Sequence, residues 1–441
     1  MEARAEPPRR LCPRRVVTNC HSGFMAPRDA RNGTLILGGG FAGAYVARLL
    51  GERGATIVSH ENFMLYTPML PEAASGTLEP RHTVVPLRVM CPHADLLIGD
   101  VRAVDLDARS ATVSTEEGDI DVQWQELVLA LGAVPRTVPV PGLAEHALSF
   151  KSLPDAINLR NHVLRRLEAA DAADAEAARL AQLSFVFVGA GYAGVEALAE
   201  LADLVADAVR FYPRLRGVQQ RWVLVDAAPK ILPEIPRRLG EYAARELAAR
   251  GVEIHVGTTL ESVSADDAVL GDGTRIPTHT LVWTAGVRPN PLLRELELPL
   301  DERGRVEVDE FLRVRDHPHV WALGDCARVP NTRASEPDPP TCQHALRQAR
   351  RLAKNLQGDL EPYGYRMLGQ VATLGRYKGI ADVLGLRLRG FIGWFVTRTY
   401  HLYQLPLAQR RTRVVVDWTV SLLFRRDLAE LGSLGHPERL D

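Results

Sequence analysis

The sequence has few of the features that mark disulfide-rich, nucleic-acid-binding or membrane-spanning proteins. Five of its 441 residues are cysteine, and none of them shows C-x-x-C or zinc-ligand spacing. An odd cysteine count in a long chain argues against a disulfide framework and favours a reducing compartment. A net charge of −1 gives no indication of nucleic-acid binding. Apolar runs stay shorter than the roughly 18 residues of a membrane span, so we expect no transmembrane helix.

The N-terminal segment also lacks the apolar stretch of a secretory signal peptide. Residues 1–31 contain seven arginines and four prolines but few large apolar residues. Such a composition predicts a disordered extension over residues 1–31. We regard Met25 as a candidate for the true start, because the ordered sequence is expected only a few residues later. An intact mass that includes Met1 would contradict this start.

Two glycine-rich segments each follow a strand-like run and precede a helix-like run. They read G-G-G-F-A-G at residues 38–43 and G-A-G-Y-A-G at residues 189–194. In the pattern G-x-G-x-x-G the first glycine permits a tight turn, the second lets the backbone approach a pyrophosphate, and the third lets helix and strand pack closely. The pyrophosphate lies at a helix N-terminus, where free N–H groups favour negative charge. Two such motifs indicate two dinucleotides with electron transfer between them; glycine turns without a ligand are the alternative.

Length and hydrophobic content predict two or three globular domains. The glycine motifs predict an α/β fold with two Rossmann-like dinucleotide-binding domains. A loop with Pro139, Pro141 and Gly142 marks the crossover between them.

Three carboxylates are candidates for contact with the dinucleotides. Asp226 ends a strand-like run, where a Rossmann domain places the acid that binds ribose hydroxyls. An acid there repels a 2′-phosphate, so we expect NADH to be preferred over NADPH, although Lys230 follows closely. Glu61 holds the corresponding place in the first domain, either as a ribose ligand or as a solvent-exposed loop carboxylate. Glu196 follows the second glycine turn, and it either interacts with the helix dipole or contacts the nicotinamide and delivers a proton there.

Five further segments carry a family resemblance. They are L-Y-T-P-M-L-P-E-A-A-S-G at 65–76, A-L-G at 130–132, T-A-G-V at 284–287, L-G-D-C-A at 323–327 and P-P-T-C-Q-H-A at 339–345. Together with the glycine turns, and in the same order, they resemble the flavoprotein reductases with two dinucleotide domains. The resemblance is closest to the type II NADH dehydrogenases and extends over most of the chain.

The resemblance implies that the first domain holds FAD, that the second binds NADH, and that the second domain is inserted in the first. The expected boundaries are 1–31 for the extension, 32–150 and 291–375 for the two parts of the first domain, 151–290 for the inserted domain, and 376–441 for an amphipathic C-terminal region. The implied FAD-binding residues are Gly38, Gly40, Phe41, Ala42, Gly43, Glu61, Ala130, Gly132, Gly324 and Asp325, of which Asp325 would hydrogen-bond the ribityl chain. The implied NADH-binding residues are Gly189, Gly191, Gly194, Asp226, Ala285 and Gly286. The segment 339–345 would lie beneath the isoalloxazine at a quinone site. Gln343 in that segment and Glu196 are the candidate catalytic residues, and we expect no metal.

The chain departs from the family pattern at several positions. The family often has Asp where this chain has Ser59. Its quinone segment is commonly A-Q-x-A-x-Q, whereas this chain has Cys342 at the first Ala, Arg347 at the second Gln, and Gln348 one position late. These departures leave the identity of the quinone open.

Cysteines are absent where disulfide reductases of this superfamily carry their redox-active pair, in residues 41–76. Disulfide reduction is therefore not expected. Sulfide oxidation, which also uses cysteines near the flavin, stays a minor alternative through Cys326 or Cys342.

The C-terminal region combines basic and aromatic residues. Eight arginines and seven large aromatic residues lie between Gly385 and Arg426, with Asp417 as the single acid. Apolar runs at 390–396 and 414–420 are too short to span a membrane. Such segments lie in the lipid interface, with arginines at anionic headgroups. A dimer interface or a helix packed on the core are the alternatives, and the family resemblance favours an anionic membrane surface.

We therefore expect a FAD-dependent NADH:quinone oxidoreductase of a respiratory chain. It would transfer hydride from NADH to FAD and two electrons to a membrane quinone without proton pumping. It would bind peripherally to the cytoplasmic face of the cell membrane, with a homodimer left open and no nucleic-acid partner. The alternatives are a soluble NADH-dependent flavin reductase that passes electrons to a ferredoxin-like partner, and a slow NADH-sensing flavoprotein.

Overall fold

The structure is a computed structural model that describes residues 28–430. The expected extension lies mostly outside the described residues, as does the candidate start at Met25. Its last four residues are ordered, because strand β1 (Arg28–Asp29) pairs in parallel with the edge of β9 (Gly118–Gln123). The amide of Arg31 also donates to the Thr56 hydroxyl at 2.8 Å. Backbone pairing of this kind leaves no mark in composition, so disorder was the wrong prediction for residues 28–31.

The first domain is built on a parallel five-stranded sheet. Its strand order is β22 (Val320–Ala322), β10 (Glu126–Leu129), β2 (Thr34–Leu37), β3 (Thr56–Ser59) and β6 (Asp95–Ile98). Both faces of a parallel sheet are normally covered, so its strands are apolar along their length, as in β2. Strand β22 follows the inserted domain in the chain, so two distant parts of the sequence complete one sheet.

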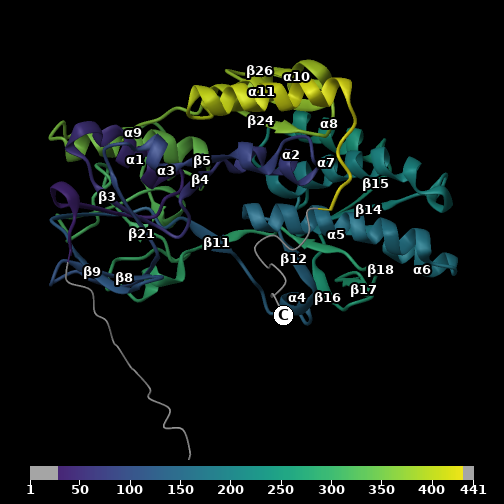
Figure 1. The fold of residues 1–441 in the computed structure, drawn as a ribbon, viewed down its shortest axis with the longest axis horizontal. Helices are drawn as coiled ribbons and strands as arrows, with labels where there is room; N and C mark the ends of the chain where they lie inside the picture. The colour runs from purple at the N-terminus through teal and green to yellow at the C-terminus, as the bar shows by residue number, and fades with distance from the viewer. Residues whose placement is uncertain (1–27, 431–441) are drawn as a thin grey trace, which may run out of the picture.

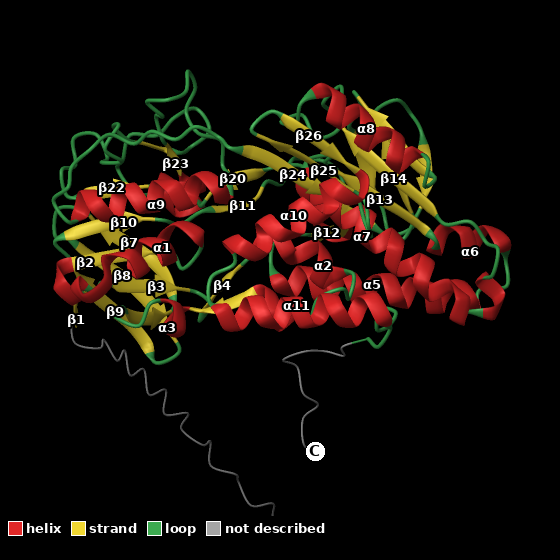
Figure 2. Cartoon of the chain, turned by 90° about the horizontal axis from the view of Figure 1, so that it is seen from above, coloured by secondary structure: helices red, strands yellow, loops and turns green. Residues whose placement is uncertain are grey.

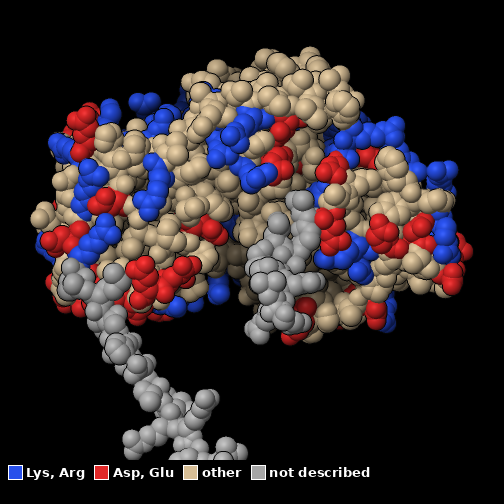
Figure 3. Space-filling view, in the orientation of Figure 1, with Lys and Arg blue, Asp and Glu red and all other residues tan. Residues whose placement is uncertain are grey.

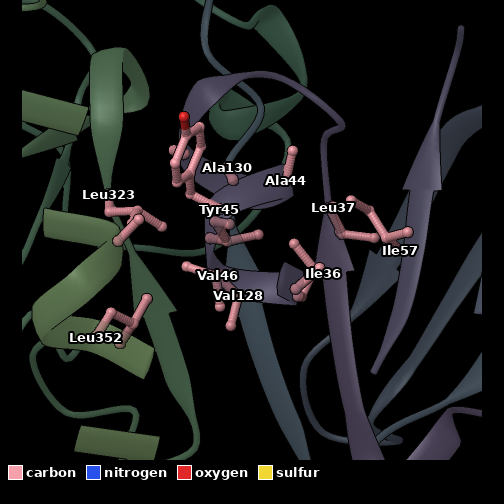
Figure 4. Packing of buried hydrophobic residues seen from close by; sticks show 14 of the residues in the cluster. Ile36, Leu37, Ala44, Tyr45, Val46, Ile57, Val128, Ala130, Leu323 and Leu352 are labelled. Atoms are coloured by element: carbon pink, nitrogen blue, oxygen red, sulfur yellow. The ribbon is translucent and has the colours of Figure 1, made fainter. Parts of the chain in front are cut away.

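One hydrophobic core joins these two parts of the chain. Helix α1 (Phe41–Leu50) follows the first glycine turn and packs against α9 (Cys342–Leu356). Figure 4 shows Tyr45 and Val46 of α1 between Ile36 of β2 and the side chains of Leu323 and Leu352 from the second part. Burial of these apolar groups holds the C-terminal half of the domain against the N-terminal half.

The second domain has its own parallel five-stranded sheet. Its strand order is β12 (Ala147–Ser149), β19 (Leu281–Trp283), β13 (Ser184–Val188), β14 (Arg221–Asp226) and β15 (Val252–Val256). Helices α5 (Leu153–Ala172) and α7 (Tyr192–Ala208) are its longest. The sheet begins at β12, a few residues before the expected domain boundary at 151.

Two antiparallel strands connect the domains. Strand β11 (Ala133–Pro135) leaves the first domain, and β20 (Val287–Pro289) returns to it. In Figure 2 the two sheets lie side by side with β11 and β20 between them. The predicted α/β fold with one dinucleotide-binding domain inserted in another is confirmed.

Smaller elements flank the two sheets. The remaining strands are β4 (Phe63–Leu65), β5 (Val84–Pro86), β7 (Asp100–Asp105), β8 (Ser110–Thr115), β16 (Leu260–Val263), β17 (Asp267–Leu270), β18 (Arg275–Pro277), β21 (Val306–Glu307) and β23 (Ala327–Arg328). The other helices that precede the C-terminal unit are α2 (Leu70–Ala74), α3 (Leu87–Met90), α4 (Leu143–His146), α6 (Glu176–Gln182) and α8 (Arg237–Ala248).

The C-terminal unit consists of an antiparallel sheet and two helices. The sheet contains β24 (Gly369–Thr373), β25 (Gly379–Val383) and β26 (Leu386–Arg389), followed by α10 (Gly390–Gln404) and α11 (Ala408–Leu423). The unit thus begins at β24, before the expected boundary at 376. Its helices form one rim of the molecule, yellow in Figure 1. Within residues 28–430, no helix combines the length and apolar character needed to cross a membrane.

Candidate functional site

The two glycine turns have the same construction. The first glycines, Gly38 and Gly189, have φ angles of 115° and 112°, a conformation that favours glycine. The last glycines cannot carry a side chain: a Cβ on Gly43 would lie 1.9 Å from the Gly38 carbonyl oxygen, and one on Gly194 would lie 1.9 Å from that of Gly189. Both turns therefore bring a helix tightly against its strand.

The middle glycines leave open space at the helix N-termini. A Cβ on Gly40 or Gly191 would meet no atom within 4 Å. These two residues cap α1 and α7, and in the described part of the chain neither helix start receives a side-chain cap or carries an acid in its first turn. Uncapped N–H groups next to open space fit a phosphate group at each turn.

The first domain contains a cavity of about 450 Å³ at the carboxyl ends of its strands. Of the ten residues implied to bind FAD, all except Gly43 line it, namely Gly38, Gly40, Phe41, Ala42, Glu61, Ala130, Gly132, Gly324 and Asp325. Gly43 lies instead at the contact between helix and strand. The structure thus brings together residues from four separate segments around one cavity that fits a dinucleotide.

Asp325 lies on a turn that a buried glutamine supports. Gly324 has a φ of 75°, and its N–H donates to Oε1 of Gln348 at 2.8 Å. Gln348 is 2% exposed and also donates to Asp338 at 2.9 Å. Gln348 therefore holds the turn in place. Burial raises the pKa of Asp325, and the charge of Lys151 opposes that rise.

Lys151 is a cavity residue that the sequence analysis missed. It lines the cavity together with Ser152. Ser152 caps helix α5 in a capping box with Asp155, and Asp155 also accepts the N–H of Lys151 at 2.9 Å. The S-x-x-D pattern of a capping box was a signal for this helix start, and it would have placed Lys151 at its entrance.

Asp226 connects the end of β14 to the second glycine turn. One carboxylate oxygen accepts the N–H of Ala190 at 2.5 Å, and the other accepts the N–H of Ala228 at 2.7 Å. The carboxylate therefore lies beside the turn that Gly189, Gly191 and Gly194 form.

The loop after β19 contacts the same glycine turn. The Thr284 hydroxyl lies 3.0 Å from the carbonyl oxygens of both Val188 and Gly189. Ala285 and Gly286 follow directly, and Gly286 has a φ of 94° with open space at its Cβ position. The structure thus gathers the six residues implied to bind NADH around one turn.

Glu196 lies inside the protein rather than at the surface of the helix start. It is 8% exposed, and its Oε1 accepts the N–H of Thr373 at 2.8 Å and the Thr373 hydroxyl at 3.2 Å. Burial raises the pKa of Glu196 to about 8, and the hydrogen bonds from Thr373 oppose that rise. Glu196 thus ties α7 to the end of β24, and it is not among the residues that line the large cavity.

A second cavity of about 400 Å³ is mostly apolar. Its lining residues come from α9, the C-terminal sheet and α10: Gln343, Arg347, Leu368, Gly369, Val371, Val383, Phe395, Val396, Thr399, Tyr400 and Tyr403. Cys342 lines the large cavity, whereas the next residue, Gln343, lines the apolar one. The first turn of α9 therefore separates the two cavities.

The cysteines near the large cavity are not activated. Cys91, Cys326 and Cys342 are free thiols, whereas Cys12 and Cys20 lie outside the described residues. Burial raises the pKa of Cys326 to about 11 and that of Cys342 to about 12. Because the thiolate is the nucleophile, thiols with such pKa values are inert at neutral pH. Sulfide oxidation therefore gains no support from these residues.

Two of the eight C-terminal arginines face the protein interior. Arg398 donates to Oε2 of Glu72 at 2.9 Å, and Trp418 donates to the same oxygen at 2.6 Å. Arg426 donates to Oε2 of Glu200 at 3.0 Å. The expectation that the arginines meet headgroups is therefore wrong for these two, which fasten the C-terminal unit to α2 and α7.

The opposite side of the C-terminal unit exposes apolar residues. These are Leu384, Leu386, Phe391, Ile392, Phe395, Tyr403, Val415, Val416, Val420, Leu422, Leu423 and Phe424, which we call the apolar rim. In the space-filling view of Figure 3, the edge formed by α10 and α11 shows few charged side chains. Exposed apolar patches of this extent mark contacts with a membrane or another protein.

The chain belongs to the pyridine nucleotide-disulphide oxidoreductase family, which it matches over residues 33–349. It is 30% identical to the mitochondrial internal alternative NAD(P)H-ubiquinone oxidoreductase A1 of Solanum tuberosum, over 91% of this chain and 89% of that protein. It is 29% identical to the type II NADH:quinone oxidoreductase Ndh of Mycobacterium tuberculosis, over 90% of this chain and 89% of the relative. The resemblance predicted from the sequence is confirmed.

The fold is also that of a solved structure. The structure of NDH2 from Plasmodium falciparum in complex with NADH has a TM-score of 0.83 to this chain at 17% identity. The match covers 92% of this chain and all of the other. At this level of identity the likeness shows the fold.

Proposed function

We propose that this protein is a FAD-dependent NADH:quinone oxidoreductase that works without proton pumping. The arrangement of the two cavities on either side of the first turn of α9 carries the proposal. One cavity contains the residues implied to bind FAD, and the other is apolar and shares a wall with the exposed helix α10. A small apolar ring can therefore come within one helical turn of the dinucleotide cavity.

The protein binds its dinucleotides through backbone groups and carboxylates. The turn at Gly38 and Gly40 and the Gly324–Asp325 turn would hold FAD, which supplies hydride acceptance and electron transfer when bound. The turn at Gly189 and Gly191 would hold the NADH pyrophosphate. Asp226 would accept hydrogen bonds from the ribose hydroxyls and disfavour the 2′-phosphate of NADPH, because two negative charges would meet there.

Glu196 is suited to hold a proton near the quinone. Its pKa of about 8 keeps the carboxyl mostly protonated at neutral pH while still able to exchange. Thr373, its hydrogen-bond partner, lies on β24, and Gly369 and Val371 of the same strand line the apolar cavity. Reduction of a quinone to a quinol consumes two protons, and Gln343 would orient the ring by hydrogen bonding.

The apolar rim would place the mouth of the second cavity in a membrane. Phe395 and Tyr403 belong both to the rim and to the cavity wall, so an apolar acceptor could enter from the lipid. The remaining exposed arginines would meet anionic headgroups. We propose peripheral binding at the cytoplasmic face of the cell membrane. A homodimer formed through the same rim is the competing use of this surface.

Steady-state turnover tests the proposal. The FAD-loaded protein should oxidise NADH rapidly with a short-chain neutral quinone, and much more slowly with NADPH. Turnover with a ferredoxin but not with a quinone would favour the soluble flavin reductase. Turnover slower than about one per second with every acceptor would favour the sensor, because ordinary enzymes exceed that rate.

A further inference from the structure

One charged side chain stands in the wall of the apolar cavity. Among the described residues that line this cavity, Arg347 alone carries a charge, and most of the others are aliphatic or aromatic. Arg347 occupies a position where the segment A-Q-x-A-x-Q has a neutral glutamine. A charge without a counter-ion in apolar surroundings is costly because it loses hydration. We therefore expect Arg347 to interact with a ligand that enters the cavity.

Arg347 makes no ion pair within residues 28–430. Its guanidinium carbon lies 5.0 Å from the centre of the Tyr365 ring, and its Nη1 is buried without a hydrogen-bond partner. Arg351, one helical turn later on α9, behaves differently: it binds Glu361 at 2.6 Å and Asp359 at 3.1 Å. The aromatic contact orients the Arg347 guanidinium but leaves its charge uncompensated.

Arg347 also lines a third, cationic cavity. It has a volume of about 540 Å³. Its other charged lining residues are Arg333, Arg350, Arg351, Lys354 and Glu361. The excess of positive charge around this neighbouring cavity makes the apolar cavity attractive to a negatively charged oxygen.

We propose that Arg347 makes the apolar cavity select an electron acceptor whose ring carries an anionic oxygen, such as the ionised hydroxyl of a hydroxyquinone. This inference rests on the proposed function, in which the same cavity admits a quinone. The ring would lie among the apolar side chains, and the anionic oxygen would accept hydrogen bonds from the guanidinium. A hydrogen bond to a charged group strengthens binding roughly ten- to a hundredfold.

Two ligands that differ in charge test the proposal. One is a hydroxynaphthoquinone whose hydroxyl is ionised at neutral pH, and the other is its neutral methyl ether. Equilibrium dialysis against the oxidised, FAD-loaded protein without NADH gives both dissociation constants. The hydroxyl compound should bind at least about tenfold more tightly than the ether. Arg347→Gln should abolish this preference by weakening the binding of the anionic compound, whereas Arg347→Lys should keep part of the preference.

Arg350→Gln is the matched control. It removes the same charge from the same helix, and Arg350 lines the cationic cavity but not the apolar one. In Arg350→Gln the ratio of the two dissociation constants should stay within about threefold of the wild-type ratio, because a solvent-screened surface charge changes binding by no more than about that factor. FAD content and circular dichroism establish that each variant is folded.

Three results would overturn the inference: equal affinity for the two ligands, an unchanged preference in Arg347→Gln, or an equal loss in Arg350→Gln. The proposed function fails separately, when the wild type does not turn over with a neutral short-chain quinone. Turnover with that quinone and no preference for the anion would refute the role of Arg347 alone.

Discussion

The buried carboxyl of Glu196 makes stability depend on pH near neutrality. Its pKa rises from an ordinary 4.5 to about 8 because burial disfavours the charged form. The folded protein therefore binds one proton more than the unfolded chain between these two values. The contribution to stability is fully present below pH 4.5 and is lost as the pH rises through about 8.

The size of the effect follows from linkage. One excess proton changes the free energy of unfolding by about 1.4 kcal/mol per pH unit. Between pH 6 and pH 8 the Glu196 contribution should fall by roughly 2 kcal/mol, since the site loses half of its proton at the upper end. Glu196→Gln removes this term, because the amide stays neutral while its oxygen can still accept from Thr373.

Urea unfolding of both proteins at pH 6 and pH 8 measures the difference. Other titrating groups cancel when the variant is compared with the wild type at each pH. The stability of Glu196→Gln relative to the wild type should rise by about 2 kcal/mol between the two pH values. A difference independent of pH would refute the reasoning, because it would mean that Glu196 keeps one charge state throughout.

Three further perturbations test other parts of the account. Asp226→Asn should raise the Michaelis constant for NADH and reduce discrimination against NADPH, and unchanged kinetics would contradict its role. Gly43→Ala should lower the FAD content measured by absorbance, whereas Gly194→Ala should leave FAD bound but weaken NADH binding, because each Cβ collides at 1.9 Å with the carbonyl oxygen of its own turn. Replacing Phe391 and Leu423, which belong to the apolar rim but do not line the apolar cavity, with serine should reduce binding to anionic vesicles and leave turnover with a water-soluble quinone intact; equal vesicle binding would remove the apolar rim as the membrane contact.

Local spacing predicted the parts of the site that lie within one turn or at strand ends. Each glycine turn depends on three residues within a span of six, so its geometry can be predicted from the sequence. Gly132 and Asp325 converge on one cavity because the carboxyl ends of parallel strands meet at one edge of a sheet. For the same reason Asp226 reaches the second glycine turn.

Long-range pairing in the C-terminal unit was not predictable from composition. The sequence suggests that Arg398 and Arg426 are two more basic residues of a membrane-binding segment. In the structure Arg398 pairs with Glu72 and Arg426 pairs with Glu200. Those pairs depend on how α10 and the chain after α11 pack on α2 and α7, which no local pattern encodes. The contact of Glu196 with Thr373, across more than 170 positions of sequence, could not be predicted either, because it also depends on long-range packing.

Anaerobic mixing follows electron transfer from NADH through the flavin to the quinone. NADH is added to the oxidised, FAD-loaded protein, and a short-chain neutral quinone follows, while the flavin absorbance at about 450 nm is recorded. We expect bleaching by NADH and prompt recovery on addition of the quinone. Absence of bleaching, or bleaching that the quinone does not reverse, would contradict electron transfer from NADH to quinone through this protein.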